Sequence, residues 1–244
     1  MKRYLFRISF NGFLYCGWQI QKNGISVQKV VQDAISKVVG AKIDIVSCSR
    51  TDSGVHANNF YFHADLDIKI DLKQLRFAVN NCLPLDVVVK EILIVDMTFH
   101  ARYSVKKKIY IYKILNSNIK NPFLKGLVLN YNRKIDLKKI KKAAKFFIGE
   151  KDFSSFCGSK CKLENKVRTI YSLDVFLKGE ILILKIVGNG FLYNMIRIIV
   201  GTLLEISEGK IDIFELENII EQKNRSLAGR TEKACGLYLD DVIY

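Results

Sequence analysis

The alternation of hydrophobic and polar side chains in the first ten residues predicts a β-strand. Tyr4, Phe6, Ile8 and Phe10 fall on one face of residues 3–10, and the residues between them are mostly basic or polar. Further along, apolar residues recur at the helical period or in short runs. The predicted elements of this half are a strand at 3–10, a helix at 27–39, strands at 43–48 and 59–65, a helix at 72–82 and a strand at 87–95.

Capping residues mark the ends of the two predicted helices. Ser26 and Asp71 precede the helical spacing, and both residue types are favoured N-caps because their side chains accept hydrogen bonds from free backbone N–H groups. Gly40 follows the first helix as a typical C-cap, and the second helix stops before Pro84. A polar loop is expected at 49–57, between two strands.

The second half of the chain has a similar succession of elements. They are a strand at 108–115, a helix at 137–148, a hairpin of strands at 167–177 and 180–187, helices at 192–207 and 212–222, and a strand at 237–244. This order predicts the α+β class, as two tandem ferredoxin-like or RRM-like domains with mostly antiparallel sheets, at 1–98 and 99–244. Since no linker separates them, we expect them to face a central, positively charged cleft.

The charge of the chain favours a polyanionic partner. The 244 residues are 49% hydrophobic and 26% charged, which is typical of a globular protein and excludes disorder as the main state. Its 39 Lys and Arg exceed its 24 Asp and Glu, for a formal net charge of +15. Such a surplus attracts nucleic acids and modestly favours them over the alternative explanation, a lysine-rich proteome.

Cysteine usage and hydropathy predict a reduced, cytoplasmic protein. Six cysteines show no framework spacing, the N-terminal residues do not resemble a signal peptide, and no stretch approaches the ~18 apolar residues of a membrane helix. Cys157 and Cys161 have the spacing of half a metal site, but the three histidines give no second pair. We therefore expect no metal, and the absence of a glycine-rich phosphate loop argues against a nucleotide cofactor.

The segment SRTDSGVHA at 49–57 is the first candidate site. It places Arg50, Thr51 and Asp52 just before Gly54, after a predicted strand. Taken alone, these residue types favour a turn. Two other segments make a functional hypothesis stronger.

One of these segments is the lysine-rich strand that begins near residue 106. Three lysines at 106–108 precede Tyr110 and Tyr112, which share a face of the predicted strand. Aromatic faces beside positive charge suit the stacking of unpaired bases along a phosphate backbone, although tyrosine is also simply common in strands. The other segment contains Arg197 among apolar residues of the predicted helix at 192–207, where an unpaired charge is costly. We expect Arg197 to meet a buried carboxylate, rather than to extend off the helix flank.

Five segments together resemble the TruA-type tRNA pseudouridine synthases. SRTDSGVHA is similar to the family's GRTDAGVHA motif. The others are FHARYS at 99–104 followed by Lys108, Tyr110 and Tyr112; DFSSF at 152–156; GFL at 190–192 followed by Met195 and Arg197; and GLYL at 236–239. They occur in the family's order over nearly the whole chain. Ser49 and Ser53 replace the usual Gly and Ala, and residues 231–235 lack the usual proline.

The resemblance implies isomerisation of uridine to pseudouridine in the tRNA anticodon stem-loop, around positions 38–40. By the family's pattern Asp52 is the nucleophile, Arg197 pairs with it, Tyr110 stacks on the uracil, and Arg50 holds the flipped nucleotide. The remaining candidates for RNA contact are Thr51, His56, Arg102 and Lys108. The resemblance also implies a homodimer. His56 is either a base or, as we favour, a residue that fixes the loop by hydrogen bonds.

The chemistry explains the need for an ionised carboxylate with a cationic partner. A carboxylate can attack C1′ of the ribose or C6 of the uracil, or assist glycal formation, and the sequence leaves these routes open. A water-poor cleft raises an aspartate pKa by up to ~3–5 units, whereas an arginine within about 4–6 Å lowers it by ~1–3. The sequence therefore predicts an Asp52–Arg197 pair.

Three alternatives remain open at this point. A non-catalytic RNA-binding protein would account for the charge and the tyrosines but leaves Asp52 and Arg197 unexplained. A retaining glycosidase needs a second carboxylate, and the loop offers one. The same chemistry on another RNA is the third.

Overall fold

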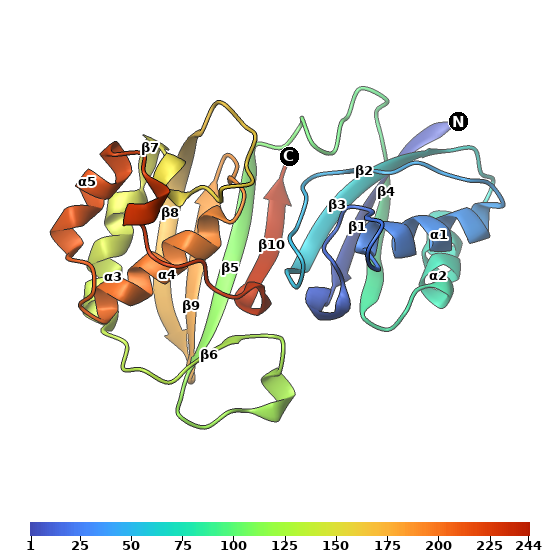
Figure 1. Ribbon diagram of the computed structural model, residues 1–244. Coiled ribbons are helices and arrows are strands. Elements are labelled where there is room, and N and C mark those ends of the chain that lie inside the picture. The colour runs from blue at the N-terminus through green and yellow to red at the C-terminus, as the bar shows by residue number, and fades with distance from the viewer. The chain divides into compact units, whose positions relative to one another are not determined.

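The computed structural model describes residues 1–244 and contains ten β-strands and five α-helices (Figure 1). The chain divides into two compact units. The first comprises Met1–Lys106 together with Tyr238–Tyr244, and the second comprises Lys107–Leu237. This content of strands and helices confirms the predicted α+β class. No helix combines the length and the apolar content needed to cross a membrane.

The first unit is a sheet with two helices. Its elements are β1 (Lys2–Phe10), α1 (Val27–Val39), β2 (Val46–Ser47), β3 (His56–Leu66), α2 (Leu72–Cys82), β4 (Val87–Val95) and β10 (Leu237–Ile243). The strand β1 lies between β4 and β3, antiparallel to both. The other edge of β3 carries β2 through Phe62 and His63, and β10 in parallel through His56 and Ala57.

Aromatic side chains fill the core of the first unit. Phe6 and Phe62 stack across β1 and β3 with ring centroids 4.8 Å apart, and Trp18 stacks on Phe60 at 4.1 Å. Helices α1 and α2 pack against each other and lie on one side of this sheet (Figure 1). Trp18 comes from the loop between β1 and α1, so this loop is tied to the core next to the strand that follows the SRTDSGVHA segment.

The second unit is an antiparallel sheet with three helices. Its elements are β5 (Lys107–Asn116), β6 (Leu129–Tyr131), α3 (Leu137–Ala144), β7 (Gly149–Asp152), β8 (Val167–Lys178), β9 (Ile181–Gly188), α4 (Met195–Ser207) and α5 (Leu216–Glu221). The strand order is β5-β9-β8-β7, and β6 pairs in parallel with the end of β5. Ten of the thirteen residues of α4 are buried, so this helix forms much of the unit's core.

The capping residues confirm several predicted boundaries. The Ser26 side chain accepts from the backbone N–H of Lys29, and Gly40 closes α1 in the left-handed region. Asp71 accepts from the backbone N–H groups of Lys73 and Gln74 at the start of α2. Strand β4 has the predicted limits, and the predicted hairpin at 167–187 forms β8 and β9.

Three predicted elements are shorter in the structure. Of the strand predicted at 43–48 only Val46–Ser47 pairs, because side chains of α1 bind the backbone of Ile43: Ser36 accepts from its N–H and Gln32 donates to its carbonyl. The helix predicted from residue 192 begins at Met195, after Asn194 with φ 60°. The helix predicted at 137–148 ends as α-helix at Ala144 and continues as a 3-10 turn.

The helix predicted at 212–222 also differs, and two strands were not predicted. Residues Ile213–Glu215 form a 3-10 turn before α5, and Asp212 accepts from the N–H of Phe214. The short strands β6 and β7 have three and four residues, too few to show a period of two in the sequence.

Candidate functional site

The SRTDSGVHA segment is a tight loop that packs on residues 15–18 of the first unit. The backbone N–H of Trp18 donates to the carbonyl of Thr51 at 3.1 Å, and the N–H of Gly54 donates to Tyr15 at 3.3 Å. Ser53 Oγ also donates to the Tyr15 carbonyl, at 3.2 Å. Within the loop, the N–H of Val55 donates to the carbonyl of Asp52 at 3.1 Å. These bonds fix the backbone on both sides of the Asp52 side chain.

Gly17 allows the close packing of this loop, and the sequence analysis did not identify it. Its φ is +102°, and a Cβ there would lie 2.5 Å from the carbonyl oxygen of Thr51. A side chain at this position would therefore push the loop away, in addition to the strain of the left-handed backbone. The only sequence signal was a glycine next to the single tryptophan, 34 positions before Thr51.

The three consecutive predicted site residues on this loop, Arg50, Thr51 and Asp52, differ in their exposure to solvent. Arg50 is exposed, whereas Thr51 and Asp52 are half-buried. Thr51 Oγ1 is buried without a hydrogen-bond partner in the protein. A buried hydroxyl without a partner costs free energy, so Thr51 carries a local cost that no hydrogen bond within the protein offsets.

His56 lies beneath the loop, at the start of β3. Its exposed fraction is 1%, its Nδ1 accepts from the backbone N–H of Gly12 at 3.1 Å, and its ring stacks on Tyr238 with centroids 4.5 Å apart. These contacts connect the end of the loop to the turn that follows β1 and to strand β10. They favour the loop-fixing role for His56 over the role of a base.

Arg102 lies in the first unit, in the turn that follows β4. The Nδ1 atom of His100 accepts from the backbone N–H groups of Arg102 and Tyr103, both at 3.2 Å, and the His100 ring stacks on Tyr103. Arg102 and these two residues line a pocket of about 240 Å³ together with Gln19, Gln28, Ile45, Val46 and Ser47. Nearby, burial and the charge of Arg3 lower the pKa of His63 to about 4, so its Nδ1 is free to accept from the N–H of Ala101.

Tyr110 and Lys108 lie two residues apart on β5 of the second unit. Tyr110 pairs with Ile186 of β9, and its ring meets Phe191 edge-to-face with centroids 5.2 Å apart. Its exposed fraction is 7%, so most of the ring is packed and its orientation is fixed. Tyr112 is fully buried, and its hydroxyl donates to the carbonyl of Lys233 at 2.6 Å.

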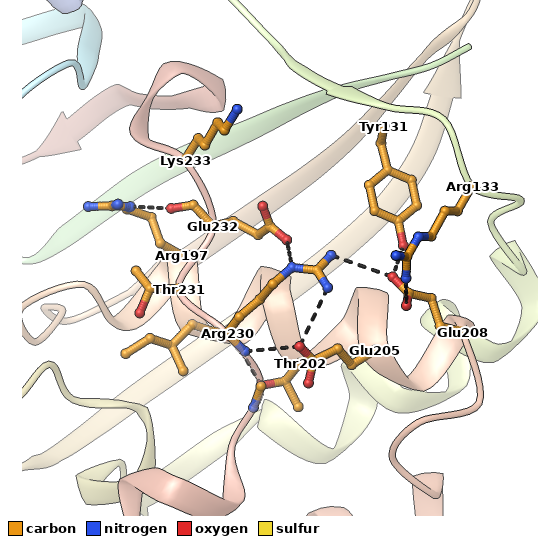
Figure 2. Close-up of polar contacts among 12 residues, drawn as sticks. Tyr131, Arg133, Arg197, Thr202, Glu205, Glu208, Arg230, Thr231, Glu232 and Lys233 are labelled. Carbon is orange, nitrogen blue, oxygen red and sulfur yellow. Dashed lines mark hydrogen bonds and ion pairs between the residues drawn. The ribbon is translucent and has the colours of Figure 1, made fainter. Parts of the chain in front are cut away.

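Arg197 lies in the first turn of α4, and two oxygen atoms of the second unit hold its guanidinium. Its Nε donates to the backbone carbonyl of Glu232 at 2.6 Å, and its Nη1 donates to Asn194 Oδ1 at 2.7 Å. The N–H of Glu232 donates in return to the carbonyl of Arg197 at 3.2 Å. Figure 2 shows Arg197 beside the segment that carries Glu232 and Lys233.

A charged network next to Arg197 was not predicted from the sequence. Arg230 contacts three carboxylates, those of Glu205, Glu208 and Glu232 (Figure 2). Although burial opposes its charge, the hydrogen bond to Glu232 and the neighbouring Glu208 raise the pKa of Arg230. The one signal in the sequence was the acidic pair Glu205 and Glu208 at the end of an apolar helix.

The surroundings of Glu208 stabilise its carboxylate in the charged form. Burial opposes its charge, but hydrogen bonds from Lys210 and Tyr131 and the nearby Arg133 lower its pKa to about 2. It is therefore ionised throughout the neutral range. No group of three or more His, Cys, Asp or Glu side chains is arranged to bind a metal ion, so no residues are assigned to one.

Each unit thus assembles its own share of the predicted site. Arg50, Thr51, Asp52, His56 and Arg102 belong to the first unit, and Lys108, Tyr110 and Arg197 to the second. In the first unit, Arg50, Thr51 and Asp52 lie on a loop held by backbone hydrogen bonds. In the second, the segment at 232–233 binds both Arg197 and Tyr112, and so joins α4 to β5.

Comparison with known proteins identifies the class. A family model described as tRNA pseudouridine synthase matches residues 143–244. The tRNA pseudouridine synthase A of Thermoanaerobacter sp. (strain X514) is 40% identical over 244 residues, the whole of both chains. Those of Bacillus cereus and Acetivibrio thermocellus are 39% and 42% identical, over 100% and 97% of this chain and 99% and 97% of theirs.

These relatives place the chain among the pseudouridine synthases, which are isomerases. It belongs to the TruA-type family of tRNA pseudouridine synthases, which confirms the resemblance of its motifs. A chain from a solved structure titled a Cbf5-Nop10-Gar1 complex aligns with 96% of this chain and 57% of its own length, at 11% identity and a TM-score of 0.37.

Proposed function

We propose that this protein isomerises uridine to pseudouridine in the anticodon stem-loop of tRNA, at positions 38–40. The observation that carries the proposal is the loop of Arg50, Thr51 and Asp52, fixed by Gly17 and Trp18, in a chain about 40% identical to tRNA pseudouridine synthases A over its full length. The net charge of +15 suits an RNA substrate.

In the proposed reaction Asp52 is the nucleophile. The N1–C1′ glycosidic bond breaks, the uracil turns while it is held, and C5 bonds to C1′. C5 then loses its proton, and N1 gains one, so the product is an isomer of the substrate. Attack at C1′, attack at C6 and a glycal route all begin at this carboxylate.

The other residues supply charge, stacking and position. Arg197 pairs with Asp52 and keeps it ionised against the cost of a water-poor cleft. Tyr110 stacks on the target uracil, and Arg50 holds the flipped nucleotide. Arg102, Lys108 and Thr51 contact the RNA, and His56 supports the loop. Flipping costs a few kcal/mol, of which stacking offsets about 1–3 kcal/mol.

The architecture proposed for this function is a pair of ferredoxin-like or RRM-like domains, at 1–98 and 99–244, that face a positively charged cleft. The β-α-β-β-α-β order of the first unit supports it. The first domain carries the Asp52 loop, and the second carries Tyr110 and Arg197. We further propose that the enzyme is a cytoplasmic homodimer.

Unmodified tRNA transcripts provide the test. Site-resolved mapping is expected to find pseudouridine at positions 38–40 after incubation with the intact protein. Asp52→Ala and Asp52→Asn should each abolish the product while tRNA binding persists. Asp67→Asn is the matched control, because the Asp67 side chain is 90% exposed and follows the end of β3, whereas the loop precedes its start.

Each other outcome has a distinct meaning. Substantial turnover by Asp52→Asn would remove the nucleophile assignment. If the intact protein binds tRNA but forms no pseudouridine, the result would favour a non-catalytic RNA-binding protein. If pseudouridine forms in a different RNA, that RNA would replace tRNA as the proposed substrate.

A further inference from the structure

We propose that Arg230 is a positioning residue for Arg197, acting through Glu232. The inference rests on the proposed function, because it requires Arg197 to act on the reacting groups. The segment that connects them, residues 229–233, is called the strap below. It runs along α4 in Figure 2 and continues toward β10.

The first step is the reciprocal contact between the strap and Arg197. The guanidinium Nε donates to the Glu232 carbonyl at 2.6 Å, and the Glu232 N–H donates to the Arg197 carbonyl at 3.2 Å. The direction of the guanidinium therefore depends on where the backbone of residue 232 lies. Any shift of this backbone changes the acceptor of Nε directly.

The second step is that the Glu232 side chain fixes this backbone. Its carboxylate is only 7% exposed and accepts from Arg230 Nε at 2.5 Å. A carboxylate with so little contact with water needs a cationic partner, since removal of that partner leaves a buried, uncompensated charge. Without Arg230, the Glu232 carboxylate would move toward water and carry residue 232 with it.

The third step is that Arg230 is itself held on α4. Its backbone N–H donates to Glu205 Oε1 at 3.2 Å, and its guanidinium lies 3.6 Å from Glu205 and 3.5 Å from Glu208. The preceding residue, Gly229, donates its N–H to Thr202 Oγ1 at 2.9 Å. Contacts along α4 thus determine the position of the strap. Through its ion pair, Arg230 in turn determines where the Glu232 side chain lies.

A purely structural role is the competing explanation, and Arg133 provides the matched control. Arg133 also pairs with the Glu208 carboxylate, whereas the ion pair of Glu232 is with Arg230. If the network only stabilised the fold, Arg230→Met and Arg133→Met would both lower the melting temperature. Neither variant would then change the rate of the catalytic step.

The test measures single-turnover pseudouridine formation and tRNA affinity separately, well below the melting temperature. For Arg230→Met we expect a rate about 10–100-fold lower, as for other displacements of about 1 Å in an active site, with a nearly unchanged Kd for tRNA. Arg133→Met should keep the wild-type rate. Arg230→Lys should recover only part of the loss, because an ammonium cannot reproduce the contacts of the guanidinium fork.

The double variant Arg230→Met with Glu232→Gln adds a readout that a stability effect would not give. It removes both charges of the Arg230–Glu232 pair, so residue 232 no longer carries an uncompensated carboxylate, and the rate should exceed that of Arg230→Met alone. A wild-type rate in Arg230→Met, or a loss confined to tRNA affinity, would overturn the inference.

Failure of the inference differs from failure of the proposed function. If the intact protein forms no pseudouridine, or if Arg197→Lys keeps the full rate, the proposed function or its Arg197 assignment fails. If Arg197→Lys is impaired while Arg230→Met is not, only the positioning role of Arg230 fails.

Discussion

At the scale of single residues, the hydroxyls of Thr51 and Thr202 differ in their hydrogen bonds within the protein. Thr202 Oγ1 donates to the carbonyl of Ile198 and accepts from Gly229, so its bonds hold the strap on α4. Thr51 Oγ1 is buried without a partner in the protein. A buried unpaired hydroxyl costs about 1–3 kcal/mol, and the proposed contact of Thr51 with the RNA would offset this cost.

This contrast predicts opposite effects of the same substitution. Thr51→Val should leave the melting temperature unchanged or raise it, because no protein hydrogen bond is lost, while kcat/KM falls about tenfold through the loss of one substrate hydrogen bond worth ~1–1.5 kcal/mol. Thr202→Val should lower the melting temperature. Thermal unfolding and steady-state assays on tRNA transcripts check both. A Thr51→Val enzyme with unaltered kcat/KM would exclude the proposed contact.

At the scale of elements, the close approach of the strap to α4 depends on a glycine inside the helix. A Cβ at Gly201 would lie 1.9 Å from the carbonyl oxygen of Arg230, far inside van der Waals contact. Glycine is normally unfavourable within a helix by about 0.5–1 kcal/mol relative to alanine. Here the packing of two elements outweighs helix propensity.

Gly201→Ala is therefore expected to be harmful despite alanine's better helix propensity. The strap must shift to admit the methyl group, at a cost of about 1–3 kcal/mol, and the Arg197 acceptor shifts with it. Both the melting temperature and the single-turnover rate should fall. Gly209→Ala is the control: φ is +72° there, but no atom lies within 4 Å of the added Cβ, so stability should fall without a change in rate. Equal rates in the two variants would contradict this account.

The sequence predicted features that depend on neighbours along the chain. Ser26 and Asp71 were found because a cap bonds a backbone group two or three residues away. The candidate loop at 49–57 could be singled out because its residues are contiguous. Gly17 and the strap were missed because their partners are distant: Gly229 bonds Thr202, 27 positions earlier, and no local pattern announces such a contact. The membership of β10 in the first unit was hidden for the same reason.

At the scale of the whole molecule, the charge of +15 predicts a salt-dependent encounter with tRNA. Counterions released from the RNA make the affinity fall with salt, with a log–log slope of roughly −0.7 to −0.9 for each phosphate neutralised. The conversion of one phosphate-contacting lysine to a neutral residue reduces that slope by about one.

Lys108 and Lys29 allow this to be measured with a control. Lys108→Gln should weaken tRNA binding. It should also reduce the log–log slope of affinity against salt by about one, the contribution of one phosphate contact. Lys29→Gln removes the same charge from an exposed ion pair with Asp33. It should change the tRNA affinity and the slope of its salt dependence only slightly. Filter binding across a salt series gives both slopes. A response of wild-type binding that is flat in salt would rule out the electrostatic account.

The placement of β10 has a consequence for biosynthesis. Tyr238, which stacks on His56 beneath the Asp52 loop, leaves the ribosome only after the entire 107–237 unit has been translated. A nascent chain can form β1 to β4 early, yet the support of the loop is incomplete until those late residues emerge. Premature termination anywhere in the second unit therefore yields a fragment in which the His56 ring lacks the stacking of Tyr238 beneath the Asp52 loop.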